Sequence, residues 1–342
     1  MDALVTESTP WTQTEFEQLE LGDARLNKRA RLLMQRLAAD PMASVPKACQ
    51  GWGETMAAYR FFDNEKVEWH AILEPHWQHT QKRMAAHRVV LCLQDTTELD
   101  FNAQGAFGLG PLSYEAQRGM YLHPTYAVTP QREPLGILDA WMWAREKKDE
   151  SGKRGGLKES LRWIEGYERI AEMAPSLPST RLVYVADREA DLMALMERAQ
   201  ALDTPADWLV RATHNRCLPE GDKLWERTTR GEAIGQITFT MASRHGVKAR
   251  TVRQHLWMQR ESCPQAEGVR RGHLSGRTRV RRSCGRQADR MALADQPRGD
   301  DVGRGDRIDR LVSSALGNRD VVQHLEECLP RRGAAVGLDP TA

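Results

Sequence analysis

The chain has 342 residues, of which 40% are hydrophobic, 28% charged and 6% aromatic, a composition typical of a soluble globular protein. Its formal net charge of +2 is too small to indicate a nucleic-acid partner by itself, and no apolar run is long enough to suggest a membrane span. The segment from Met1 to Phe16 contains Glu7 and Glu15 and no basic residue, so we expect no secretory signal. Six scattered cysteines without a CxxC pair argue against a zinc site or a disulfide scaffold and fit a reducing cytoplasm.

Residues 1–85 are expected to form a helical domain. Asp23 can N-cap a helix that runs to about Ala39 and carries three leucines as a partial apolar stripe. The other faces of this helix carry basic residues and no acid, namely Arg25, Lys28, Arg29, Arg31 and Arg36. Two further helices are predicted, over Glu54–Phe62 and from Trp69 to about His87.

From residue 88 onwards the pattern changes to short apolar runs that alternate with helical segments. Strands are predicted over Arg88–Asp95, Tyr121–Val128, Gly136–Trp143, Arg181–Asp187 and Trp208–Thr213, and helices over residues 157–173 and Glu189–Ala201. Strands followed by βα units predict an α/β core over residues 86–215. Weak alternation predicts that residues 216–260 begin a β-rich insertion.

Two acids each close an apolar strand. Asp95 ends the first predicted strand, and Asp187 ends the run Leu182–Ala186. Carboxylates at the ends of neighbouring strands can share divalent ions, and two ions about 4 Å apart can clamp the attacking and leaving oxygens of a phosphodiester. The alternative interpretation is structural, because Asp187 can N-cap the following helix and Asp95 can open a turn.

Basic residues on the first long helix could bind DNA phosphates. A solvated helix face is the alternative, since residues 1–80 hold 12 acids against 8 basic residues. Arg118, His123, Arg211 and His214 lie near predicted strand ends, where a substrate could reach them, although such residues are more often ordinary surface groups.

Several motifs resemble those of one known family. Asp95-Thr-Thr97 and Asp187-Arg-Glu-Ala-Asp191 resemble the first two acidic motifs of bacterial insertion-sequence transposases of the DDE type. Further motifs match in the same order: Leu21-Gly-Asp-Ala-Arg25, Ala58-Tyr-Arg-Phe61, Arg118-Gly with His123, Glu150-Ser-Gly-Lys153 and Leu209-Val-Arg-Ala-Thr-His214. The resemblance covers residues 10 to about 258.

This resemblance implies a ribonuclease-H-like α/β core behind a helical DNA-binding domain, with a β-rich insertion after the second acid. It implies Mg²⁺, or Mn²⁺, held by Asp95 and Asp187 as catalytic metal ligands. The partner would be double-stranded DNA, both terminal inverted repeats and target, engaged by a homodimer on paired ends and without a membrane. The expected DNA contacts are Arg25, Lys28, Arg29, Arg60, Arg118, His123, Arg188, Arg211 and His214.

The last quarter of the chain has a different composition. Residues 258–342 contain no Phe, Trp, Tyr or Lys, but hold 16 Arg and 12 acidic residues. The family's third acid should stand in a Tyr-x2-Arg-x3-Glu-x6-Lys signature, and the sequence lacks it. A reading frame displaced by one base permits Tyr at Val312, Arg at Ala315, Glu at Arg319 and Lys at Glu326.

We therefore expect a frame displacement that begins between about Arg260 and Gly272, and we expect residues 261–342 to be disordered. The alternative is a genuine Arg-rich disordered segment. A sequencing error in an intact gene is a further possibility.

The predicted function is that of a transposase, which cleaves DNA at insertion-sequence ends and joins the 3′ ends to target DNA by two-metal chemistry. The chain as written is expected to be inactive because the third acid is lost. The alternatives are a non-catalytic DNA-binding product that competes for the element ends and a metal-dependent nuclease without strand transfer. The expected location is the bacterial cytoplasm, in association with the nucleoid.

Overall fold

The computed structural model describes residues 10–102, 107–218, 220–233, 235–243, 248–257, 259–261, 276–283 and 291–295. These residues divide into two compact units. The N-terminal unit comprises the described residues up to Arg83, together with Gly136–Leu138. The core unit comprises Met84–Leu135 and the described residues from Asp139 onwards.

Helices make up the N-terminal unit up to Arg83, as expected. They are α1 (Pro10–Glu15), α2 (Ala24–Ala39), α3 (Val45–Ala48), α4 (Trp52–Phe62) and α5 (Trp69–Met84). The predicted cap is confirmed, because the carboxylate of Asp23 accepts a hydrogen bond of 2.8 Å from the backbone N–H of Arg25. Helix α4 begins two residues before its expected start, since Gly51 with φ of 99° supplies the turn that precedes it.

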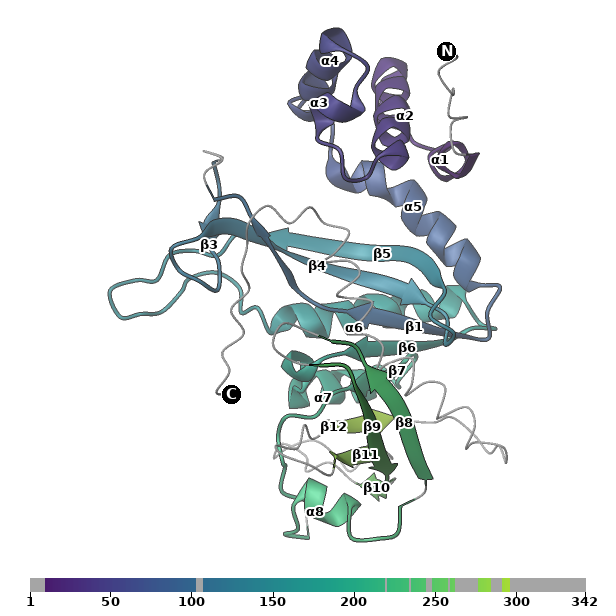
Figure 1. Cartoon of the computed structure of the whole chain (residues 1–342), viewed down its shortest axis with the longest axis vertical. Helices are drawn as coiled ribbons and strands as arrows, with labels where there is room; N and C mark the ends of the chain where they lie inside the picture. The colour runs from purple at the N-terminus through teal and green to yellow at the C-terminus, as the bar shows by residue number, and fades with distance from the viewer. Residues whose placement is uncertain are drawn as a thin grey trace. The chain divides into compact units, whose positions relative to one another are not determined.

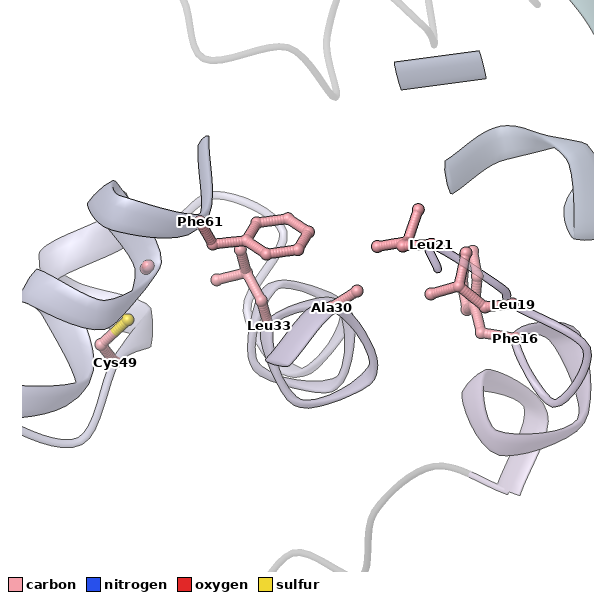
Figure 2. Packing of buried hydrophobic residues seen from close by; sticks show 8 residues of the cluster. Phe16, Leu19, Leu21, Ala30, Leu33, Cys49 and Phe61 are labelled. Atoms are coloured by element: carbon pink, nitrogen blue, oxygen red, sulfur yellow. The ribbon is translucent and has the colours of Figure 1, made fainter. Parts of the chain in front are cut away.

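A small apolar core holds α2 against α1 and α4. Figure 2 shows the ring of Phe61 beside Leu33 of α2, with Leu19 and Phe16 on the other side of Ala30. All five side chains are less than 5% exposed. Burying a side chain such as Phe or Leu contributes about 2 kcal/mol, so this cluster fixes which faces of α2 and α4 point outward.

A seven-stranded mixed sheet forms the centre of the core unit. Its strands are β1 (Val89–Gln94), β2 (Thr97–Asp100), β3 (Gly110–Pro111), β4 (Arg118–Val128), β5 (Pro134–Trp143), β6 (Arg181–Ala186) and β7 (Asp207–Val210). Strand β1 pairs antiparallel with β4 and parallel with β6, and β6 pairs parallel with β7. The remaining strands β2, β3 and β5 pair with β4. Figure 1 shows β4 and β5 side by side. The long predicted strands are therefore confirmed.

Helix α6 (Leu161–Met173) packs close to β1. A Cβ atom on Gly166 would lie 2.0 Å from the side-chain amide nitrogen of Gln94, so only glycine allows this approach. Gln94 is fully buried, and its amide donates to Thr125 (3.1 Å) and accepts from Tyr184 (2.8 Å). This satisfied polar network fixes the end of β1 immediately before Asp95.

The region between β6 and β7 differs slightly from the expected single helix. A 3-10 turn, η2 (Arg188–Ala190), follows β6, and α7 (Met193–Ala201) begins only after it. The break between η2 and α7 arises because Asp191 and Leu192 leave the helical conformation. Another 3-10 turn, η1 (Ala174–Ser176), lies earlier in the chain, between α6 and β6.

A second, five-stranded sheet follows the short helix α8 (Leu224–Thr228). It consists of β8 (Gly235–Met241), β9 (Arg250–Leu256), β10 (Gln259–Glu261), β11 (Gly276–Ser283) and β12 (Met291–Asp295). The order is β10-β11-β9-β8, with β12 paired to β11. The β-rich character expected from residue 216 is present in β8 and β9.

Strands β11 and β12 differ from the disorder expected for residues 261–342. Gly276–Ser283 contains four arginines, and it pairs antiparallel with both Met291–Asp295 and β9. Backbone pairing thus gives these two segments regular structure without any aromatic residue. The other residues of 262–342 lie outside the described part of the chain. Within that part, no helix is both long and apolar enough to cross a membrane.

Candidate functional site

The exposed face of α2 carries the first group of expected DNA contacts. Arg25 and Lys28 are exposed and Arg29 is half-buried. Residues three and four apart lie on one side of a helix, so these three cations share a face. In the described part of the chain no ion pair involves Lys28 or Arg29, whereas Arg25 pairs with Asp23 at 2.8 Å. The Arg25 pairing lowers the pKa of Asp23 to about 2.

The other two basic residues of α2 have structural roles. Arg31 donates to the backbone carbonyls of Phe16 (2.9 Å) and Glu17 (2.8 Å), which joins α2 to the chain after α1. Arg36 pairs with Glu54 of α4 at 2.9 Å. No local sequence pattern separates these two arginines from the other three cations of the helix.

The outward residues of α4 were not predicted beyond Arg60. Arg60 is exposed, and so are the neighbouring aromatic residues Trp52, Tyr59 and Phe62, which are 76%, 45% and 52% exposed. Sequence periodicity missed them because it treats aromatic residues as candidates for the core.

The structure brings Asp95 and Asp187 to one edge of the sheet. Gln94 of β1 and Ala186 of β6 are paired Cα partners in parallel strands. Each acid is the next residue, so the two leave the sheet side by side, on strands about 5 Å apart. Ala186 pairs in turn with Val210 of β7, which places Arg211 next to Asp187 in the same row.

Each carboxylate also makes a local hydrogen bond. Asp95 Oδ1 accepts from the backbone N–H of Thr96 at 2.8 Å, and Asp187 Oδ1 accepts from that of Glu189 at 2.7 Å. Asp187 therefore caps the 3-10 turn η2 and not the helix expected after it, because α7 begins only at Met193. Among the residues that the structure describes, no cluster of three or more His, Cys, Asp or Glu side chains could hold a metal ion.

The number and type of donor groups at this site are those that a hard divalent cation uses. Mg²⁺ is usually bound through one or two carboxylates, with waters and substrate phosphates completing its shell. Asp95 and Asp187 provide such a donor pair at the ends of adjacent strands, but they provide no complete protein cage.

His123 is buried, which corrects its expected role as a DNA contact. It is 1% exposed and lies edge-on against Trp163, with 4.6 Å between the ring centroids. Burial lowers the pKa of His123 to about 4, with a smaller contribution from Arg162. Its Nδ1 atom lies 2.7 Å from Thr96 Oγ1. His123 therefore orients the residue that follows Asp95 and cannot reach DNA.

The remaining expected DNA contacts of the core unit lie in two separate regions. Arg118, at the start of β4, donates to the carbonyls of Glu115 and Gln117, so it stabilises the β3–β4 turn. Arg188 is exposed directly after Asp187, and His214 is exposed just beyond Arg211.

Asp191 is a site residue that the sequence analysis did not assign. Its buried carboxylate accepts the backbone N–H groups of Thr213 (2.6 Å) and His214 (2.9 Å) and pairs with Arg216. It thereby fixes the loop after β7 beside the acid pair. The signal was present in the sequence, since Asp191 belongs to the same short acidic motif as Asp187.

Comparison with known proteins gives two findings. A solved structure described as a piggyBac transposase synaptic complex with hairpin DNA aligns with 97% of this chain and 68% of its own chain, at 9% identity and a TM-score of 0.38. The second finding concerns helices α1 to α4. Residues 8–67, which contain all four, match the family of transposase DNA-binding domains.

Proposed function

We propose that the chain is a transposase that binds DNA through its N-terminal unit. The observation that carries this proposal is the match of residues 8–67 to transposase DNA-binding domains. The outward cations of α2 support it, because Lys28 and Arg29 have no ion pair among the described residues. Cations of this kind neutralise phosphates and release counterions from duplex DNA.

In this proposal the core unit is the ribonuclease-H-like catalytic core of a DDE enzyme. The mixed sheet supports it, with β1 between antiparallel β4 and parallel β6. Asp95 and Asp187 would hold Mg²⁺ or Mn²⁺, and the bound ion would supply Lewis-acid stabilisation of phosphodiester oxygens. Arg188, Arg211 and His214 would contact the DNA backbone, and their position in the chain directly after β6 and β7 supports this assignment.

The proposal includes inactivity of the chain as written. Arg319 stands at the position of the third acid in the displaced frame, and it lies outside the described residues. The proposed substrates are inverted-repeat ends bound as a pair by two copies of the chain, inside a bacterial cell. The non-catalytic alternative is a product that occupies those ends without cutting them.

A binding assay tests the DNA-binding part. Duplexes selected from a random 40-bp pool on the full chain would be titrated at several salt concentrations, with wild type and Lys28→Ala. We expect the logarithm of the association constant to fall linearly with the logarithm of the salt concentration. The magnitude of this slope should be smaller in the variant by about 0.9 for each phosphate that is no longer neutralised. Lys82→Ala, an exposed cation of α5 outside residues 8–67, is the matched control. Failure of the wild-type chain to bind any duplex would contradict the proposal.

A second assay tests the metal site and the chemistry. Mn²⁺ binding followed by electron paramagnetic resonance should weaken in Asp95→Asn and Asp187→Asn, and Mg²⁺ should support no cleavage of selected duplexes by the chain as written. Repeat-independent cleavage would favour a simple nuclease. Resequencing codons 250–342 and the bases beyond would decide whether a Tyr–Arg–Glu–Lys frame lies open behind the displacement.

A further inference from the structure

Helix α4 carries large aromatic side chains on its outward face as well as on its inward face. Thr55, Ala58 and Phe61 are buried against α2. Trp52 and Tyr59 are exposed and are not part of this core. Figure 1 shows α4 beside α2. A helix that only packs on its neighbour places its large apolar residues inward, so the outward face of α4 requires another explanation.

Two exposed aromatic residues and a half-buried methionine form one stripe on α4. Trp52, Met56 and Tyr59 follow each other at intervals of four and three residues, so they lie on one side of the helix. Arg60 is exposed next to Tyr59. Single exposed apolar residues are common on protein surfaces, but clustered ones mark an interaction site.

The charge of this stripe favours a polyanion as its partner. The acid of α4, Glu54, pairs with Arg36, and its second oxygen accepts the backbone N–H of Gln50 at 3.3 Å. Arg60 has no ion pair among the residues that the structure describes. The outward face of α4 therefore presents aromatic rings together with an exposed cation that makes no ion pair with any residue the structure describes.

We infer that the Trp52–Tyr59 stripe of α4 is a base- and sugar-contacting surface for duplex DNA; this inference rests on the proposed function. Helix α4 lies wholly inside the segment that matches transposase DNA-binding domains. It has 11 residues, so it is about 16 Å long, and a helix fits the major groove, which is about 12 Å wide. The apolar stripe is too small to hold a protein dimer alone, because stable interfaces bury about 1,600 Å².

In this assignment, α2 and α4 make different kinds of contact with DNA. The cations of α2 contact phosphates, which positions the protein without reading sequence. The rings of α4 contact groups within the groove, such as thymine methyls, which differ between base pairs. Loss of the rings should therefore lower selectivity, whereas loss of an α2 cation should weaken binding to all sequences equally.

The test compares Trp52→Ala/Tyr59→Ala with wild type in the full chain. The probes are a duplex selected from the random 40-bp pool and a shuffled duplex of the same composition. We expect the ratio of the two affinities to fall at least tenfold, with the affinity for the shuffled duplex and the salt slope unchanged. Trp52→Phe/Tyr59→Phe should retain most of the selectivity, and circular dichroism would verify folding.

Trp11→Ala is the matched control, since Trp11 is also exposed in the N-terminal unit but lies on α1. Equal selectivity in wild type and in Trp52→Ala/Tyr59→Ala would overturn the inference and leave the proposed function intact. An equal loss in Trp11→Ala would overturn it too. Loss of self-association in sedimentation, with selectivity unchanged, would assign the stripe to a second copy of the chain. A wild-type chain that binds neither duplex would overturn both the inference and the proposed function.

Discussion

Helix α4 of the N-terminal unit and helix α6 of the core unit differ in how they expose a Trp and a Tyr side chain. In the N-terminal unit, Trp52 and Tyr59 are exposed on α4. In the core unit, Trp163 and Tyr167 of α6 are buried against the sheet. Trp163 and Tyr167 thus stabilise the packing of α6 on the sheet, while Trp52 and Tyr59 remain available to a partner.

Some arginines of the two units differ in a similar way. In the core unit Arg145 pairs with Glu159 and lies over the ring of Tyr121, 4.0 Å from its centroid. Arg216 pairs with the buried Asp191. Arg29 and Arg60 of the N-terminal unit have no such partner in the described part of the chain. Residue type alone therefore does not separate a cation with a structural partner from one without, whereas the contacts in the structure do.

The largest expected effect on the free energy of unfolding comes from substituting a structural cation of the core unit. Arg216→Ala leaves the carboxylate of Asp191 buried without its counter-charge, so we expect a loss of about 3 kcal/mol in the free energy of unfolding. Urea denaturation of the full chain measures it. Lys28→Ala should change that free energy by less than about 0.5 kcal/mol. Equal effects of the two substitutions would remove the contrast between the units.

The pH dependence of stability tests the burial of His123. The folded-state pKa is about 4, below the usual value of 6.5, so the unfolded chain binds the proton more readily between these values. Stability is then fully present above pH 6.5 and falls as pH decreases towards 4, by roughly 3 kcal/mol from this group. His123→Gln should flatten that part of the profile. A profile unchanged by the substitution would mean that His123 is accessible to solvent.

A smaller loss in the free energy of unfolding is expected from a substitution at the contact between α6 and β1. Gly166→Ala places a Cβ atom against the buried amide of Gln94, so we expect a loss of about 2 kcal/mol from overpacking. Gly221→Ala provides a comparison, because open space surrounds its Cβ position and any cost comes from its φ of 88°. Thermal unfolding of both variants measures the difference, and a larger loss in Gly221→Ala would mean that α6 can move away from β1.

The smallest effect separates two cations within the N-terminal unit. Arg60→Ala should lower the salt slope of DNA binding by about one unit. Lys47→Ala should leave the slope unchanged, because Lys47 already pairs with Asp40 at 3.0 Å. Titration at four salt concentrations checks both. A slope that responds equally to the two substitutions would show that pairing with Asp40 does not withhold Lys47 from DNA.

The sequence predicted the long elements of the fold because each has a strong local signal. Asp23 caps α2, and the apolar runs that end on Asp95 and Asp187 form β1 and β6. The burial of His123 could also have been predicted, since Tyr121 and Thr125 alternate with it on the inner face of β4. The expected domain boundaries and the metal ligands remain predictions.

Other features depend on contacts that no local pattern encodes. Strand β11 forms because β9 and β12 offer backbone partners to an arginine-rich segment. The exposure of Trp52 depends on how α4 rotates when Phe61 packs on Leu33. Similarly, the different roles of Arg31 and Arg29 follow from distant carbonyl groups that Arg31 reaches and Arg29 does not.

The parallel pairing of β1 with β6 has a consequence for the order of folding. The paired strands are separated by about 90 residues of chain, and closing so long a loop costs entropy before any contact compensates for it. The β1–β4 pair is much closer in sequence and can form earlier. Asp187 therefore joins Asp95 late, so a ribosome-bound or truncated chain that ends before β6 would lack the acid pair.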